Sequence, residues 1–330
     1  SSSNLTNNNG DTYIYLAIRR SDGYCGKPYG AGEGTSVFSI GTGNGSNTIP
    51  SLVTGFPVDI SIIKKPATTT GWYLYGRLIQ EKYLETNTTA AEGVDNYGNF
   101  DSNTGFYNYS ALDSNWQGWS WKRHSGFDCV AYDGNGSSSG QVIPHNLGPN
   151  NIPEMIWIKR RDTTEYWAVG HKGSNGGTNP WNYGLYLNTS GSQSASTIFF
   201  NNTAPSSSHF TVGSGGEVNT NNGKYLALLF SSVPGISKCG FYDGSNSSQT
   251  ITTGFQPRFL MIRRVDSGYS WYVLDTTRGW GSGNDSQLAI DTNGSALSHD
   301  FGAPTSTGFT LTSFDSYNTS GGKFIYYCHA

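Results

Sequence analysis

The sequence is poor in charge and has no long apolar runs. Only 13% of its 330 residues are charged and the formal net charge is −3, so the composition lacks the basic excess typical of nucleic-acid-binding proteins. No stretch approaches the roughly 18 consecutive apolar residues of a membrane-spanning helix, and no signal peptide is visible. We therefore expect neither nucleic-acid binding nor membrane insertion.

Cysteine is also scarce. Four cysteines in a chain of this size do not make a disulfide framework, and spacings of about a hundred residues exclude a paired-cysteine zinc site. Cys129 and Cys239 each precede a Tyr-Asp-Gly triplet by three residues, so they occupy matching places in a repeat. Because matching places in different repeats are usually far apart, we expect free, buried thiols at Cys25, Cys129, Cys239 and Cys328.

The motifs of the common enzyme classes are missing as well. The six histidines form no HxxxH or HExxH pattern, and neither a nucleophile elbow nor a phosphate-binding loop is present. The segment Asp133-Gly-Asn-Gly136 resembles the start of a calcium loop, but Pro144 stands where such a loop needs glutamate. We predict a turn there, with an irregular cation site as the open alternative, and we predict no catalytic residue, no metal site and no cofactor.

Glycine, aromatic and small polar residues dominate what is present. The chain has 44 glycines and 14% aromatic residues, and the aromatic and β-branched residues fall in short runs between Gly, Asn and Ser. This pattern is typical of many short strands joined by turns, and no segment shows a convincing helical stripe. The sequence predicts an all-β protein with little helix.

One stretch, residues 133–169, recurs. It contains a turn, a spacer and a hairpin whose first strand is Met155-Ile-Trp-Ile158, followed by basic residues and Trp167-Ala-Val169. Related copies lie at residues 43–74 and 243–273. The period of about a hundred residues fits a whole small β domain. We predict tandem antiparallel β-sandwich (jelly-roll-like) repeats at 36–125, 126–236 and 237–330, with the first the most divergent, after a terminal strand and Gly-rich linker at 1–35.

The hairpin strand predicts burial on both faces. Met155 and Trp157 point to one side and Ile156 and Ile158 to the other, so the strand is expected to be central and covered twice. A basic pair that ends each copy is expected to mark the exit to solvent, with the acids after it as ion-pair partners. These pairs are Lys64-Lys65, Arg160-Arg161 and Arg263-Arg264, and the acids are Asp162 and Asp266.

Binding is more plausible than catalysis for a surface rich in Asn, Ser, Thr, Tyr and Trp, because such residues combine flat apolar faces with adaptable hydrogen bonds. Candidate ligand-binding aromatic residues lie outside the matched strands, and the alternative is that they fill interfaces between repeats or subunits. The candidates are Trp181, Tyr183, Trp280, Tyr269 and Trp116. The variable loops 171–184 and 276–286 are the segments most suited to recognition. Trp72, Trp157, Trp167 and Trp271 are expected in the core.

Three segments together carry a resemblance. They are Tyr132–Asp162, Gly254–Asp266 and Gly223–Phe230. They resemble a repeated domain of tail-fibre and other virion structural proteins of bacteriophages, especially marine cyanophages. The resemblance covers most of 126–330 and, more weakly, 36–125. It implies a non-enzymatic protein of the virion surface that associates with copies of itself and with other virion proteins; a trimer is common for fibres. It is also compatible with recognition of a host-surface polysaccharide.

Three other functions remain as alternatives. They are a capsid decoration or head-fibre protein, an extracellular carbohydrate-binding module of a bacterial surface protein, and a glycan depolymerase. A depolymerase needs two or three carboxylates beside an aromatic groove, whereas the acids of this sequence are few and scattered.

Overall fold

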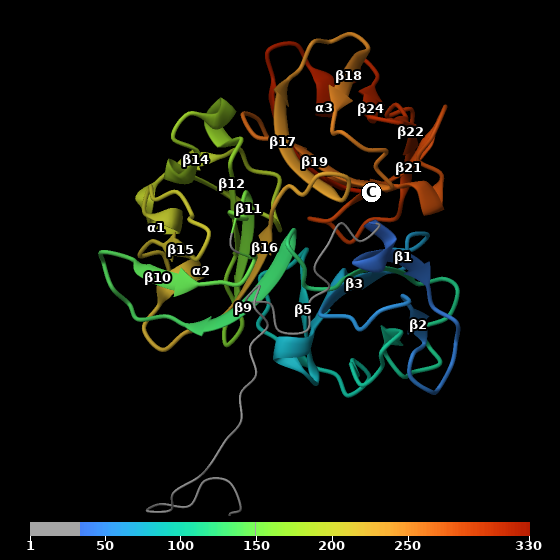
Figure 1. Cartoon of the computed structure of the whole chain (residues 1–330), viewed down its shortest axis with the longest axis horizontal. Coiled ribbons are helices and arrows are strands. Elements are labelled where there is room, and N and C mark those ends of the chain that lie inside the picture. Colours follow the sequence, from blue (N-terminus) through green and yellow to red (C-terminus); the bar gives the residue numbers. More distant parts are fainter. Residues whose placement is uncertain (1–33, 149) are drawn as a thin grey trace, which may run out of the picture.

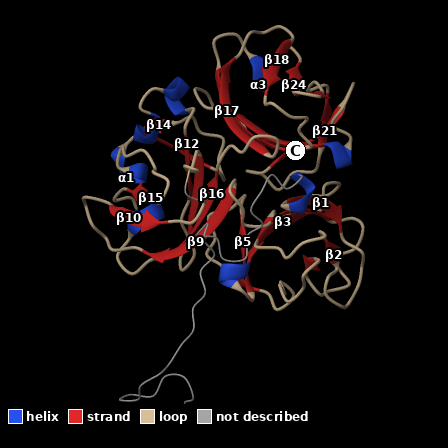
Figure 2. Ribbon diagram, in the orientation of Figure 1, coloured by secondary structure: helices blue, strands red, loops and turns tan. Residues whose placement is uncertain are grey.

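The computed structural model describes residues 34–148 and 150–330. The expected strand at Tyr13–Arg20, the Gly-rich linker and Cys25 lie outside the described residues. Short strands are the main regular elements of the described residues, and the three α-helices there are four residues each, α1 (Thr197–Phe200), α2 (Gly216–Asn219) and α3 (Asp315–Asn318). The prediction of an all-β fold with little helix is confirmed (Figure 2).

The strands form three units of the same design. Unit one contains β1 (Phe38–Thr42), β2 (Leu52–Val53), β3 (Ile60–Lys64), β4 (Tyr73–Gly76), β5 (Lys82–Glu85), β6 (Gly93–Val94), β7 (Gly105–Phe106) and β8 (Gln117–Trp121). Unit two contains β9 (Phe127–Asp133), β10 (Gln141–Pro144), β11 (Met155–Arg160), β12 (Trp167–His171), β13 (Tyr183–Tyr186), β14 (Ser194–Ala195), β15 (His209–Val212) and β16 (Lys224–Phe230).

Unit three contains β17 (Ser237–Asp243), β18 (Gln249–Thr252), β19 (Phe259–Arg264), β20 (Tyr272–Asp275), β21 (Asp285–Ala289), β22 (Leu297–His299), β23 (Pro304–Thr305), β24 (Gly308–Leu311) and β25 (Lys323–His329). Single 3₁₀ turns lie at Gly34–Ser36, Arg77–Ile79, Ser174–Gly177, Pro180–Asn182 and Thr276–Arg278.

Each unit pairs a large sheet with a small one. The large sheets run β1-β8-β3-β4-β5-β6, β9-β16-β11-β12-β13-β14 and β17-β25-β19-β20-β21-β22, which is one strand order three times. The small sheets are β2-β7, β10-β15 and β18-β24-β23. The last strand of each unit, which we call its closing strand (β8, β16 or β25), pairs with both the first strand and the hairpin of that unit. In unit one the closing strand β8 contains Trp119 and Trp121.

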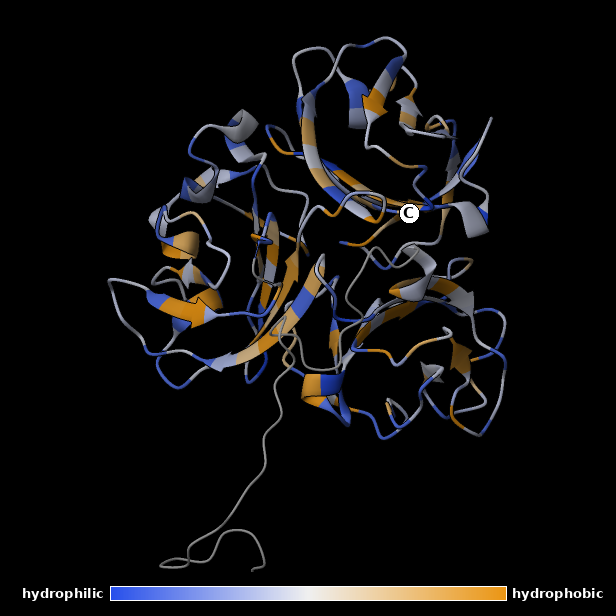
Figure 3. Cartoon of the chain, in the orientation of Figure 1, coloured by the Kyte–Doolittle hydropathy of each residue, from blue (hydrophilic) through white to orange (hydrophobic). Residues whose placement is uncertain are grey.

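The hairpin strands are buried on both faces, as predicted. In β11, Met155 and Trp157 belong to one apolar cluster, and Ile156 and Ile158 belong to another. In β19, Phe259 and Met261 likewise face away from Leu260 and Ile262. Hydrophobic residues concentrate on such strands, whereas the connecting loops are mostly polar (Figure 3). The period of two in the sequence therefore separates two distinct cores.

The first of these cores is shared by all three units. The large sheets turn one face toward a common centre, and the small sheets lie on the outside (Figure 1). Equivalent residues such as Ile62, Trp157 and Met261 meet in this single central cluster, as do Cys129 and Cys239. The expectation that matching positions lie far apart is therefore wrong, because the units close around one another instead of following in a line. Cys239 and Cys328 are buried free thiols, as predicted.

Three equivalent tryptophans join the units in a cycle. Trp72 of unit one donates its indole N–H to Ala289 O and Thr292 O of unit three, both at 3.0 Å. Trp167 of unit two donates to a carbonyl of unit one, Glu85 O, at 2.9 Å. Trp271 of unit three donates to a carbonyl of unit two, Tyr186 O, at 3.0 Å. Each indole is buried, so each unit depends on its neighbour to satisfy a polar group.

Buried basic side chains lie at the same joints. Register places Lys64, Lys159 and Arg263 at equivalent positions, and all three have 0% exposure. The expected exit to solvent is therefore wrong for Lys64 and Arg263: the side chain crosses to the next unit and donates to backbone carbonyls. Only the residue after each cation reaches the rim, where Arg160 and Arg264 pair at 2.8 Å with their predicted partners, Asp162 and Asp266.

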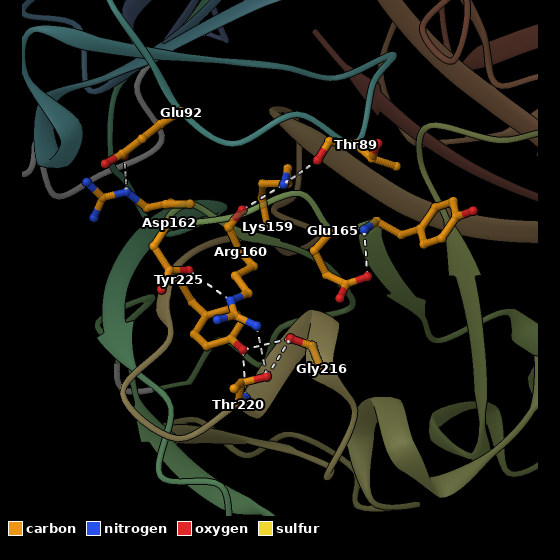
Figure 4. A network of polar contacts seen from close by, with 11 residues as sticks. Thr89, Glu92, Lys159, Arg160, Asp162, Glu165, Gly216, Thr220 and Tyr225 are labelled. Carbon is orange, nitrogen blue, oxygen red and sulfur yellow. Dashed lines mark hydrogen bonds and ion pairs between the residues drawn. The ribbon is translucent and has the colours of Figure 1, made fainter.

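The joint between units one and two is drawn in Figure 4. The Lys159 ammonium donates to Thr89 O of unit one at 3.3 Å and to Arg160 O at 2.7 Å. Arg161 pairs with Glu92 of unit one at 2.7 Å. Because Lys159 is buried and has only carbonyl partners there, burial lowers its pKa to about 8. Burial does the same to Lys64, whose pKa is also lowered to about 8.

Candidate functional site

The outer face of each large sheet shows where the units differ. In unit two three outer positions of β12 and β13 are small, Ala168, Gly170 and Gly184, beside the larger Tyr186. A Cβ on Gly170 would lie 2.6 Å from the ring of Phe200, and one on Gly184 would lie 2.3 Å from the ring of Phe199. The covering loop and α1 of unit two therefore press aromatic rings directly onto the sheet, and this face is filled.

Unit one carries tyrosine at those same three positions. Strand register matches Tyr73 to Ala168, Tyr75 to Gly170 and Tyr83 to Gly184. The tyrosine rings project from the sheet at the positions where, in unit two, Phe199 and Phe200 pack against small residues. Tyr73 and Tyr83 are half-buried and pack edge to face, with ring centroids 5.4 Å apart.

The segment that covers unit one does not close over these rings, and it leaves a cleft of about 590 Å³. This volume lies within the range of small-ligand sites. The cleft has walls from β3, β4, β5 and β6 and from the loops that follow β6 and β7. Its lining residues are Ile63, Tyr73, Tyr75, Tyr83, Val94, Asp95, Asn96, Tyr97, Tyr107, Tyr109, Ala111, Leu112 and Trp116.

The surroundings of Trp116 also differ from those of the equivalent residues in the other units. Its counterparts Tyr225 and Phe324 are each covered by a stacked tyrosine of the first strand, at 5.0 Å between centroids. Unit one has Gly43 at that place, directly after β1, and Gly43 N donates to Trp116 O at 3.1 Å. Trp116 therefore lacks that stacked tyrosine and packs instead near Tyr73, at 6.0 Å.

Asp95 organises the cleft wall. Its Oδ2 accepts a hydrogen bond from the Tyr75 hydroxyl at 2.5 Å and a longer one from the Tyr107 hydroxyl at 3.5 Å. Its Oδ1 accepts from the backbone N–H of Tyr97 at 2.7 Å. One carboxylate thus fixes three tyrosines from three segments of the chain. Burial is the main cause that raises the pKa of Tyr75 and Tyr107 above that of an ordinary phenol, so both stay protonated donors.

The rim shows further features of a binding site. Tyr97 and Tyr109 stack on each other at 4.0 Å with 42% and 38% exposure. Tyr107 has a φ of +70°, a left-handed conformation that is costly for an aromatic residue and tends to occur where function requires it. Paired exposed rings beside a strained tyrosine form a rigid aromatic surface, which suits ligands with flat apolar faces and hydroxyl groups.

The five aromatic candidates from the sequence do not form one site. Trp116 lies in the cleft. Trp181 and Trp280 are only 6% and 3% exposed. They fill the outer cores of their own units, two and three, and do not lie at an interface between repeats. Tyr183 and Tyr269 are half-buried, and Tyr269 packs under the Arg264 guanidinium. The variable loops 171–184 and 276–286 thus bury their tryptophans.

The six cleft tyrosines were missed by sequence reasoning. Tyr73, Tyr75, Tyr83 and Tyr107 looked like ordinary strand residues, and Tyr97 and Tyr109 lay outside the expected strands. A comparison of the repeats could have identified them, because unit one has large residues at the positions where unit two has small ones.

Within residues 34–148 and 150–330, no three His, Cys, Asp or Glu side chains gather as a potential set of metal ligands. Asp133 and Asp243, from the turns that resemble calcium loops, pair with Lys224 and Lys323 at 2.6 and 2.8 Å. Among the same residues, no helix has the length and apolar character needed to cross a membrane.

A family comparison matches residues 110–330, from the end of the cleft segment through units two and three. The chain belongs to the family described as a domain of unknown function (DUF7483). The match includes the closing strand of unit one and Trp116, but not Tyr73, Tyr75, Tyr83 or Asp95. No curated protein matches the chain. Most of the cleft therefore lies in the part of the chain that precedes the matched region.

Proposed function

We propose that the chain is a non-enzymatic structural protein of a phage virion surface that recognises a host-surface glycan through the aromatic cleft of unit one. The observation that carries the recognition step is that unit one has Tyr73, Tyr75 and Tyr83 where unit two has small outer residues, and that these rings line an open cleft. Unit three has Tyr272 and Leu274 at the places of Tyr73 and Tyr75. Stacking of sugar faces on rings and hydrogen bonding to phenols are the interactions such a surface provides.

The virion assignment rests on the resemblance of residues 132–162, 223–230 and 254–266 to virion structural proteins. The closed arrangement of three units is consistent with it, because one shared core and three cyclic joints make a rigid body that holds a binding surface in place. Association with copies of itself and with other virion proteins is part of the same proposal.

Glycan binding is tested on an array of bacterial surface polysaccharides, with the full chain and two tyrosine variants. Tyr109→Ala removes an exposed cleft ring, and Tyr166→Ala removes an equally exposed ring of unit two, at 43% exposure. We expect the first to weaken binding roughly tenfold and the second to leave it unchanged, since loss of an aromatic contact worth about 1.4 kcal/mol lowers affinity tenfold. Absence of binding to every polysaccharide would contradict recognition.

Location is tested by immunogold labelling of virions with antibody to this chain. Label on the tail or its appendages supports the proposal. Label on the head would favour the decoration alternative, and glycan binding without any virion label would favour a bacterial carbohydrate-binding module. Sedimentation equilibrium of the purified chain measures self-association directly.

A further inference from the structure

We infer that the cleft of unit one takes an uncharged saccharide and that the carboxylate of Asp95 sets this preference against acidic ones. The inference rests on the proposed function and names the ligand class for the same site. It begins with the charges of the lining. Asp95 is the one charged residue among the lining residues of the cleft, and these include no lysine, arginine or histidine.

The negative charge of Asp95 cannot swing away from a ligand. Its two oxygens are held by Tyr75 and Tyr107 on one side and by the Tyr97 backbone on the other. A uronate, sialate or phosphate in the cleft would therefore bring a like charge near a fixed carboxylate with no lining cation to offset it. Such an arrangement discriminates by repulsion as well as by fit.

Cations near the cleft are engaged elsewhere. The Lys65 ammonium lies over the ring of Trp116, 5.2 Å from its centroid, and Lys65 is not a lining residue. Lys82, on the strand that carries Tyr83, pairs with Glu92 at 2.5 Å. Neither supplies a free positive charge to the interior of the cleft.

An amino sugar is also a poorer fit than a neutral one. Three donors already occupy the oxygens of Asp95, so an ammonium ligand would have to compete with the two tyrosine hydroxyls and a backbone N–H. The hydroxyl groups of a neutral sugar need not displace these donors, and they can form hydrogen bonds with the phenol groups and the Asn96 amide that line the cleft.

The test compares array glycans of three kinds, namely neutral, uronate-containing and amino-bearing, on the full chain at low and high salt. We expect the neutral glycans to bind at least tenfold more tightly than the uronate-containing ones. We expect the gap to narrow at high salt, because salt screens the repulsion. Tighter binding of acidic or amino-bearing glycans would overturn the inference while leaving glycan recognition intact. No binding of any kind would overturn the proposed function itself.

Two variants separate charge from shape. Asp95→Asn keeps an oxygen acceptor for the tyrosines and removes the charge, so the preference for neutral over uronate-containing glycans should fall below about threefold. Tyr75→Phe removes one hydroxyl donor and keeps the charge, so the preference should persist. A thermal melt of each variant reports whether it is folded. If Asp95→Asn is folded and retains the tenfold preference, the role assigned to Asp95 is wrong.

Discussion

Replacement of Trp167 by phenylalanine tests whether the three units depend on one another. The indole N–H of Trp167, in unit two, donates at 2.9 Å to Glu85 O in unit one, and the ring is fully buried in the shared core. Loss of a buried hydrogen bond with one partner left unmatched costs about 1–3 kcal/mol, and the smaller ring loses roughly 1 kcal/mol of apolar burial. We therefore expect Trp167→Phe to lower the free energy of unfolding by about 2–4 kcal/mol.

Urea unfolding followed by circular dichroism measures this loss. Because the joint lies between units, we expect one cooperative transition at a lower midpoint with an unchanged slope. Hydrogen exchange then locates the effect: amides near Glu85 in unit one should exchange faster along with those of unit two.

Trp280→Phe is the matched control for this prediction. Its indole N–H donates at 2.8 Å to Gly302 O within unit three, so a similar loss of stability should accelerate exchange mainly in that unit. If Trp167→Phe left the exchange of unit one untouched and produced a separate transition of unit two, the shared core would not couple the units.

Three further substitutions test particular features. Lys159→Met should stabilise the protein near neutral pH, because the folded pKa of about 8 makes the buried ammonium costly below that pH. In urea titrations, the stability advantage of the variant over wild type should shrink by about 1.5 kcal/mol between pH 8 and 9.5. A difference in stability that stays constant with pH would contradict this. Burial lowers the pKa of His171 to about 3, so the unfolded chain takes up a proton below about pH 6.5 and the folded chain does not; between pH 7 and 5 wild type should lose about 2 kcal/mol more than His171→Gln, and equal losses would refute this. Gly184→Tyr should abolish folding or cost more than about 3 kcal/mol, since a Cβ there meets Phe199 at 2.3 Å; a normal melting temperature would show that the outer face of unit two is not filled.

Local patterns in the sequence predict the strands well. Alternation in Met155–Ile158 predicts a strand with two apolar faces, and the structure places those faces in two different cores. The hairpin partner, the closing strand and the ion pairs of Asp162 and Asp266 follow from the same short segments. All of these features depend on neighbours close in sequence or on repeated registers.

The closure of the units around a common core depends on contacts that no single repeat reveals. Trp167 looks like any core residue of unit two, and its partner Glu85 O lies 82 positions away in unit one. From the sequence alone, Lys159 looks like the exposed end of a strand, because a lysine is rarely buried. Its burial depends on a backbone acceptor in another unit, which the sequence of its own repeat does not reveal.

The cleft was only partly predictable for a related reason. Trp116 was a candidate because it is an aromatic residue outside the matched strands. Tyr73 and Tyr83 were not, since tyrosine is an ordinary strand residue. Their meaning comes from the difference between units: Ala168 and Gly184 at the same places are covered, whereas the tyrosines are not.

A crystal structure of the full chain with the tightest-binding array glycan tests the central claim most directly. The account predicts a neutral sugar seated in the cleft of unit one, in contact with Tyr83 and Trp116, with no sugar on the filled outer faces of units two and three. A sugar bound instead at loop 171–184 or loop 276–286, with the cleft unoccupied, would contradict it.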